Sequence, residues 1–209
     1  TEIYTLSLHD ALPIWVGRTA DAGAWGSHSF LNQSLSGTLT RLFRPAPGVD
    51  VQPDRTFVDD GVLLVELSPT ALRFVTLGCF AAVLGLLTFG VRRIARAEMQ
   101  AKDPVAARRT YGLAEIAMFA CGMVLLSPQS SKAHFCVWLF PAAFLADRLL
   151  RGRRDLLLWG LVLTAMLVGP LASKGIVGRE LGNRLLACGN VAWCTVLLLL
   201  AVLRGLRRS

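Results

Sequence analysis

Charged side chains are scarce in this sequence. Lys, Arg, Asp and Glu make up only 17% of the 209 residues, whereas 54% are hydrophobic, and the mean hydropathy is +0.52. A soluble domain of this length ordinarily carries more charge and fewer apolar residues. The shortage of charge therefore favours a polytopic membrane protein, for which we expect an all-α fold.

The patterns of several common sites are also missing. The five cysteines lie inside apolar runs without a CxxC pair, and His9, His28 and His134 show no ligand spacing. Neither a disulfide framework nor a metal site is predicted, and the cysteines are expected to be small buried residues. No glycine-rich nucleotide loop is present. No cofactor is expected.

Positive charge is concentrated at particular positions. Of the 22 Lys and Arg residues, six lie in 92–109, four in 148–154 and three after Leu203. These groups flank the same ends of the hydrophobic runs, and the opposite ends carry only four. The positive-inside rule places the arginine-rich ends in the cytoplasm. No aromatic and basic platform accompanies the arginines, so no nucleic-acid partner is expected.

Five hydrophobic runs predict about five transmembrane helices within a membrane domain over residues 70–209. With the arginine-rich C-terminal end inside, an odd count places residues 15–69 and the loop 127–134 on the outer face of a cell membrane. The runs are 74–91, 110–126, 133–146, 156–173 and 185–203.

Residues 1–14 lack the basic segment and apolar core of a signal peptide. Their sequence resembles the translated read-through of a sequencing adapter, and a genuine polar loop is the alternative. We expect an artefact here, and we expect the rest to be the C-terminal part of a longer protein that is inactive without its other half.

Residues 15–69 contain no run of membrane length, and we expect an extracytoplasmic segment. Leu31, Leu35, Leu39 and Leu42 recur at helical spacing, which predicts an interfacial amphipathic helix. Ser29 is the predicted N-cap, and Pro45 ends the helix. The Asp-Gly pair within 57–63 predicts a tight hairpin.

The polar loop 126–134 separates two hydrophobic runs and is the first candidate site. Gln129, Ser130 and Ser131 supply donors beside a helix N-terminus, although a serine-rich helix cap has the same pattern. Lys132 and His134 can bind an anion or pass a proton. A hydrated interfacial histidine is the alternative.

Asn32, Gln33 and Ser34 on the predicted outer helix form the second candidate site. Their amide and hydroxyl groups can grip sugar hydroxyls or phosphate oxygens. The competing interpretation is a solvated polar helix face, which the spacing alone favours. Asn190, deeper in its run, is expected to link helices rather than bind a ligand.

Two strings carry a resemblance to a known family. Asn-Gln-Ser-Leu-Ser-Gly at 32–37, followed by Thr-Arg-Leu at 40–42, and Leu-Ser-Pro-Gln-Ser-Ser-Lys-Ala-His-Phe at 126–135 resemble the C-terminal half of glycosyltransferase family 87. The resemblance covers residues 24–205. It implies a multi-spanning, C-type, mannosyltransferase-like enzyme that uses a polyprenyl-phosphate sugar donor on the outer face of the membrane.

The resemblance implies roles for the candidate residues. A carboxylate in the missing N-terminal half would be the base, while His134 is the catalytic candidate within this chain. Asn32, Gln33, Ser34, Ser127, Gln129, Ser130 and Lys132 would bind the donor and a lipid or glycan acceptor. A membrane transporter or lipid-binding protein is the main alternative, and a non-catalytic subunit is the third. The near absence of ionisable residues at mid-span argues against a transporter.

Overall fold

The computed structural model describes residues 32–45, 62–101, 103–128, 130, 136–151 and 155–206. All regular secondary structure within these ranges is helical, which confirms the all-α prediction. The helices are α2 (Leu35–Phe43), α3 (Pro69–Gln100), α4 (Pro104–Leu126), α5 (Leu139–Arg151), α6 (Leu156–Val168), α7 (Lys174–Val177), α8 (Arg179–Ala187) and α9 (Asn190–Gly205).

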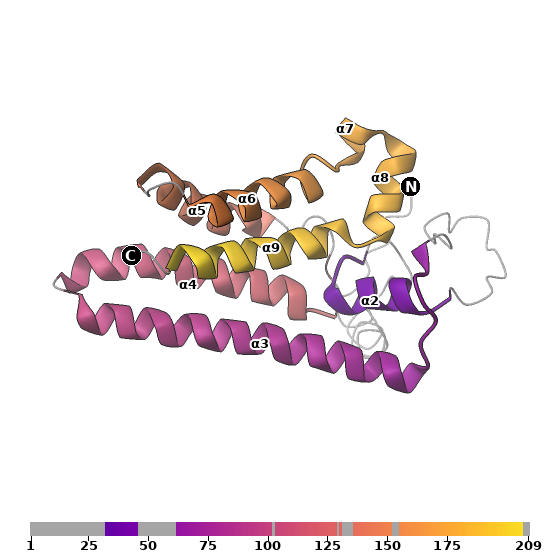
Figure 1. Ribbon diagram of the computed structural model, residues 1–209, viewed down its shortest axis with the longest axis horizontal. Coiled ribbons are helices and arrows are strands. Elements are labelled where there is room, and N and C mark those ends of the chain that lie inside the picture. The colour runs from indigo at the N-terminus through magenta and orange to yellow at the C-terminus, as the bar shows by residue number, and fades with distance from the viewer. Residues whose placement is uncertain are drawn as a thin grey trace, which may run out of the picture.

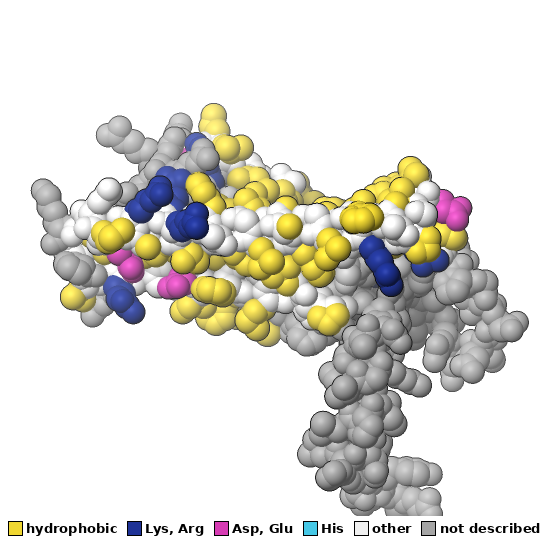
Figure 2. Space-filling model, turned by 90° about the horizontal axis from the view of Figure 1, so that it is seen from below, with side chains coloured by type: hydrophobic (Ala, Val, Ile, Leu, Met, Phe, Trp, Pro, Cys, Tyr) yellow, Lys and Arg dark blue, Asp and Glu magenta, His cyan; other side chains and the backbone are white. Residues whose placement is uncertain are grey.

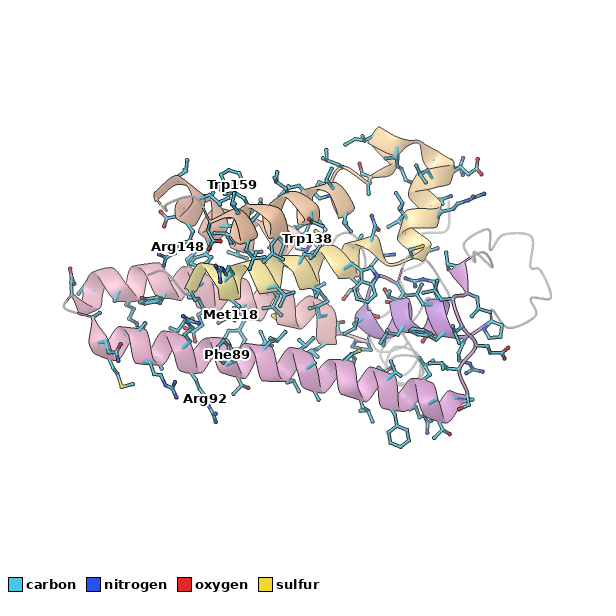
Figure 3. The ribbon with its side chains drawn as sticks, viewed as in Figure 1. Phe89, Arg92, Met118, Trp138, Arg148 and Trp159 are labelled. Carbon is cyan, nitrogen blue, oxygen red and sulfur yellow. The ribbon has the colours of Figure 1, made fainter. Side chains whose placement is uncertain are left out.

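The long helices lie side by side in an elongated bundle (Figure 1). α3 forms one edge and packs on α4, α4 packs on α9, and α6 covers α9 at the other edge, while α5 contacts both α4 and α9. Met118 lies between α4 and α3 (Figure 3). The fully buried core side chains from α4, α5 and α9 include Met118, Leu125, Phe144, Leu198 and Val202.

Local sequence signals set the helix boundaries. Ser68 caps α3 by accepting a hydrogen bond from the Ala71 N–H at 3.2 Å, and Pro69 occupies the first turn, where its missing donor costs nothing. Asp155 caps α6 through the Leu158 N–H. α6 ends at Val168 because Pro170 disfavours helical backbone at the residue before it.

Three of the five predicted runs are not single α-helices over their described residues. In the run 133–146 the described α-helix begins at Leu139, with Pro141 tolerated in its first turn. The run 156–173 stops at Val168. The run 185–203 is two helices, α8 and α9, that meet at 63°. Among the described helices, only α3 is long and apolar enough to cross a membrane by itself. If the bent pair of α8 and α9 is counted as one span, the number of candidate spans rises to two.

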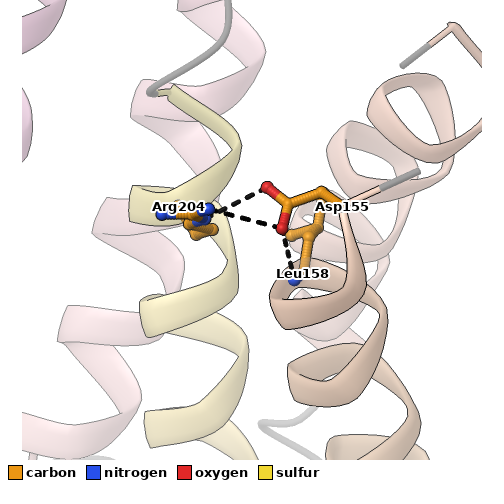
Figure 4. Close-up of polar contacts among 3 residues, drawn as sticks. All are labelled: Asp155, Leu158 and Arg204. Atoms are coloured by element: carbon orange, nitrogen blue, oxygen red, sulfur yellow. Dashed lines mark hydrogen bonds and ion pairs between the residues drawn. The ribbon is translucent and has the colours of Figure 1, made fainter. Parts of the chain in front are cut away.

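The connections give the bundle two chemically different ends. α3 runs toward the end where α4 begins, and α5 and α9 end there while α6 starts there (Figure 1). Arg92, Arg96, Arg148 and Arg204 lie toward this end, which we call the arginine end. There Arg204 Nε pairs with Asp155 Oδ2 at 3.1 Å, joining α9 to α6 (Figure 4). α2 and α8 lie at the opposite end, which we call the polar end.

The outer face of α3 is apolar. Phe74, Leu77, Leu84 and Phe89 are all more than half exposed, and only 11% of the most apolar stretch of this helix is buried. Figure 2 looks onto this face, where yellow apolar side chains cover the middle and dark blue Lys and Arg lie toward the two ends. A buried helix in a soluble protein would show the opposite arrangement.

Candidate functional site at the polar end

The α2 helix begins at Leu35, and its cap is Ser34 rather than the predicted Ser29, which lies outside the described residues. The Ser34 Oγ accepts a hydrogen bond from the Gly37 N–H at 3.0 Å. Leu35, Leu39 and Leu42 are buried, in agreement with the predicted amphipathic pattern. The helix ends at Phe43, before Pro45, as predicted.

The predicted hairpin at 57–63 falls mostly outside the described residues. Of its positions the structure describes only Val62 and Leu63, and neither is in a strand. The Leu64 N–H donates instead to the Leu42 carbonyl at the end of α2.

The strings at 32–37 and 126–135 meet in space. The Gln33 N–H donates to the Ser130 carbonyl at 2.6 Å. Asn32 Oδ1 accepts from the Ser130 N–H at 3.4 Å, and Asn32 Nδ2 and Ser34 Oγ donate to the Pro128 carbonyl at 3.4 and 3.2 Å. These contacts join residues that lie more than 90 positions apart in the sequence.

A second set of bonds joins α2 to the elbow between α8 and α9. Gln33 Nε2 donates to the Leu186 carbonyl at 2.7 Å. Arg41 donates through Nε to the Ala187 carbonyl at 2.9 Å and through Nη1 to the Asn32 carbonyl at 2.6 Å. Each of these carbonyls belongs to the end of a helix or to irregular backbone, where intrahelical donors run out.

Burial affects the pKa of the Arg41 side chain. Desolvation lowers the pKa of this guanidinium to about 10, an effect partly opposed by the nearby Cys188. A guanidinium with this pKa remains protonated at neutral pH, so its donors stay available to the carbonyls it binds. Arg41 therefore acts as a buried cationic clamp.

The elbow itself requires glycine. Gly189 has φ +76°, in the left-handed region, and a Cβ on it would overlap the Thr38 side chain of α2. Only glycine satisfies both conditions without strain or displacement. α2 and the start of α9 can therefore approach closely.

These contacts change the interpretation of the predicted binding residues. Asn32, Gln33, Ser34 and Ser130 are 0–1% exposed, so the solvated-face interpretation is wrong for the first three. Their hydrogen bonds hold backbone together. The Ser130 hydroxyl donates to the Val124 carbonyl in the last turn of α4 at 2.8 Å.

The other predicted residues of the loop divide into two groups. Ser127 is half-buried, and its N–H donates to the Met123 carbonyl at 3.1 Å. Gln129, Lys132 and His134 lie outside the described residues, so their predicted roles remain predictions.

Two cavities flank this network. The first, of about 450 Å³, lies between α2 and α3, where Thr40, Arg44, Arg73 and Thr76 supply polar groups beside Leu72 and Leu77. Two guanidinium groups form a donor set suited to a phosphate, whereas the Thr40 hydroxyl already donates to the Ser36 carbonyl at 2.9 Å. Sequence reasoning missed Arg44 and Arg73. A usable signal was that each arginine lies close to the proline that bounds its helix. Arg44 directly precedes Pro45, and Arg73 follows Pro69.

The second cavity, of about 360 Å³, is apolar and lies beside the elbow, lined by Trp138, Pro170, Leu186, Asn190 and Val191. Asn190 Nδ2 donates to the Val168 carbonyl at 3.0 Å, which links α9 to α6 as predicted. Its buried Oδ1 has no hydrogen-bond partner among the described residues. Trp138 points toward α9 (Figure 3) and donates to Thr195 Oγ1 at 2.9 Å.

The cysteines follow the prediction only in part. Cys121 and Cys194 are buried, whereas Cys136 beside the second cavity is exposed.

Comparison of the chain with protein-family models, with curated proteins and with solved structures found no match.

Proposed function

We propose that this chain is part of a polytopic membrane protein whose arginine end faces the cytoplasm. Phe74–Val91 carries no charge and spans about 27 Å at roughly 1.5 Å per residue, close to the thickness of a hydrocarbon core. The exposed apolar face of α3 supports this placement. The helices α4, α6 and α9 lie roughly along the axis of α3, and they would contribute to the predicted set of about five spans.

We propose further that the parent protein is a mannosyltransferase-like hexosyltransferase that moves a sugar from a polyprenyl-phosphate donor to an acceptor on the outer face. One observation carries this proposal. The two strings that resemble glycosyltransferase family 87 are joined by buried hydrogen bonds at the end of the bundle opposite the arginine end. Residues that serve one site should be brought together in this way.

In this mechanism the acceptor hydroxyl attacks the anomeric carbon of the donor. A new glycosidic bond forms as the bond to the polyprenyl phosphate breaks, and a carboxylate elsewhere in the parent takes the hydroxyl proton. Arg44 and Arg73 stabilise the departing phosphate from the 450 Å³ cavity. Lys132 and His134 remain the proposed additional cations, while Asn32, Gln33 and Ser34 shape the site without contacting substrate.

The test is turnover by the parent protein in liposomes supplied with a polyprenyl-phosphate sugar and a lipid acceptor. We expect His134→Ala to reduce kcat about 100-fold, because a preorganised donor to developing charge is lost. The melting temperature should stay unchanged. Arg184→Gln is the control, since this exposed arginine pairs with the likewise exposed Glu180, and it should retain full turnover.

Near-normal turnover of His134→Ala would contradict the proposed role of this residue in the reaction. The absence of any transfer by the intact parent with several sugar donors would contradict the proposed enzyme. Saturable binding of polyprenyl phosphate without transfer would favour the second candidate, a lipid-binding protein, for which the apolar cavity beside Trp138 and Asn190 is the supporting observation.

A further inference from the structure

A cleft of about 740 Å³ opens at the arginine end, far from the candidate site. Its walls come from the last turns of α3 and from Leu206 at the end of α9. Arg92, Arg93 and Arg96 line it, and no ion pair of these three arginines occurs among the described residues. The cleft is therefore strongly cationic and has no internal counter-charge.

The helical spacing of α3 explains this concentration of charge. Thr88, Arg92, Arg96 and Gln100 are four residues apart and form one row along the helix, and the neighbouring row contains Arg93. Glu98 belongs to a different row, with the buried Gly90 and Ile94 that face the bundle. The nearest acidic residue in the sequence thus lies outside the lining of the cleft.

The cleft changes character along its length. The guanidinium groups, the Gln100 amide and the Thr88 hydroxyl supply donors toward the arginine end. Phe89 and Gly85 continue the lining toward the apolar middle of α3, and the space beside Gly85 is open, with no atom within 4 Å of an added Cβ. Arg92 lies on the side of α3 that faces away from α4 (Figure 3).

We propose that this cleft binds an anionic phospholipid. The headgroup phosphate contacts Arg92, Arg93 and Arg96, and an acyl chain lies along Phe89 and Gly85. Basic pockets beside membrane helices on the cytoplasmic side suit such headgroups. A free phosphate would use the arginines but not the apolar extension, which is why the geometry favours a lipid. The inference rests on the proposed membrane placement and does not depend on sugar transfer.

Native mass spectrometry of the detergent-solubilised protein tests the proposal. The probes are phosphatidylglycerol and phosphatidylcholine with identical acyl chains, and inorganic phosphate as competitor. We expect phosphatidylglycerol to bind more tightly than phosphatidylcholine, and millimolar phosphate to leave it bound. The double variant Arg92→Gln with Arg96→Gln should bind phosphatidylglycerol about 25-fold more weakly, roughly fivefold for each arginine.

The matched control removes two exposed arginines from the polar end, Arg179→Gln with Arg184→Gln. It has the same net charge as the test variant and should bind phosphatidylglycerol like the wild type. Equal losses in both variants would overturn the proposal in favour of non-specific charge attraction. Displacement of the lipid by inorganic phosphate would overturn it in favour of a free-anion site.

A second variant tests the apolar part of the cleft without changing charge. Gly85→Leu places a side chain in the open space and should weaken phosphatidylglycerol binding at an unchanged melting temperature. Unchanged lipid binding by a folded Gly85→Leu protein would contradict the proposed position of the acyl chain. Because none of these measurements involves a sugar donor, failure of the transferase proposal leaves them interpretable.

Discussion

Arg41 shows how one buried side chain can hold several segments together. It binds the carbonyls of Ala187 and Asn32 and approaches Thr38 Oγ1 at 3.4 Å. Removing a guanidinium from such a position leaves acceptors buried without donors, which costs more than the bonds themselves contributed. Its importance is therefore structural, even though an arginine near a proposed phosphate site suggests ligand binding.

We predict that Arg41→Gln lowers the free energy of unfolding by about 3 kcal/mol, because hydrogen bonds from a charged donor contribute roughly 1.5–3 kcal/mol each. Denaturant titration in detergent measures the change. Arg44→Gln, at an exposed position three residues along, should change it by less than about 0.5 kcal/mol. Equal effects of the two substitutions would contradict the clamp.

The pH dependence of this contribution follows from the pKa of Arg41, about 10 in the folded protein and lowered from its ordinary value by burial. Between pH 6 and 9 the group is protonated in both the folded and unfolded states, so the difference between wild type and Arg41→Gln should be constant. Above pH 10 the folded protein begins to lose the Arg41 proton, whereas the unfolded chain keeps it. Taken by itself, this difference makes the free energy of unfolding increase with pH.

At the scale of elements, the elbow between α8 and α9 is the main departure from the predicted architecture. The run 185–203 is uncharged and its polar side chains are Asn190 and Thr195, so hydropathy alone predicts one helix. Gly189 breaks it by adopting left-handed backbone. The break also exposes the carbonyls of Leu186 and Ala187, which Gln33 and Arg41 then bind.

We predict that Gly189→Ala destabilises the protein by about 3 kcal/mol, the sum of left-handed strain of roughly 1–2 kcal/mol and the overlap with Thr38. Gly175→Ala, where a Cβ meets open space, should be neutral or slightly stabilising. Thermal melting in detergent compares the two variants, and an equal effect of both would contradict the requirement for glycine at position 189.

Sequence patterns predicted some boundaries of these elements and missed others for identifiable reasons. Pro45 ends α2 because proline acts locally. The start was misplaced because Asn32 and Gln33 are held in extended backbone by Ser130 and Leu186, and no local pattern reveals partners 98 or 153 residues away. The same distance explains why these polar residues could not be predicted to be buried.

At the scale of the whole molecule, charge predicted the arrangement of the ends better than hydropathy predicted the helices. Most of the described arginines that flank the predicted runs lie toward one end of the bundle, whereas Arg73, Arg179 and Arg184 lie toward the other. The charged residues lie at the ends of the runs, so their positions depend little on how the run between them is folded. The number of spans depends on bends such as the one at Gly189, which composition does not encode.

We predict that the arginine end is cytoplasmic. In a background without the five native cysteines, membrane-impermeant maleimide applied to intact cells should label Arg179→Cys but not Arg96→Cys. Both positions are exposed in the structure, so accessibility within the protein does not distinguish them. Labelling of Arg96→Cys alone would reverse the orientation, and labelling of both only after the cells are broken would place the polar end inside as well.

The ion pair between Asp155 and Arg204 also has a consequence for the order of events during biosynthesis. The two residues are 49 positions apart, so at about 5–20 residues per second the ribosome makes the guanidinium roughly 2–10 s after the carboxylate. Within the described bundle α6 packs chiefly on α9, and the ribosome makes α9 after α6. The contact between α6 and α9 therefore cannot form until well after α6 has been synthesised.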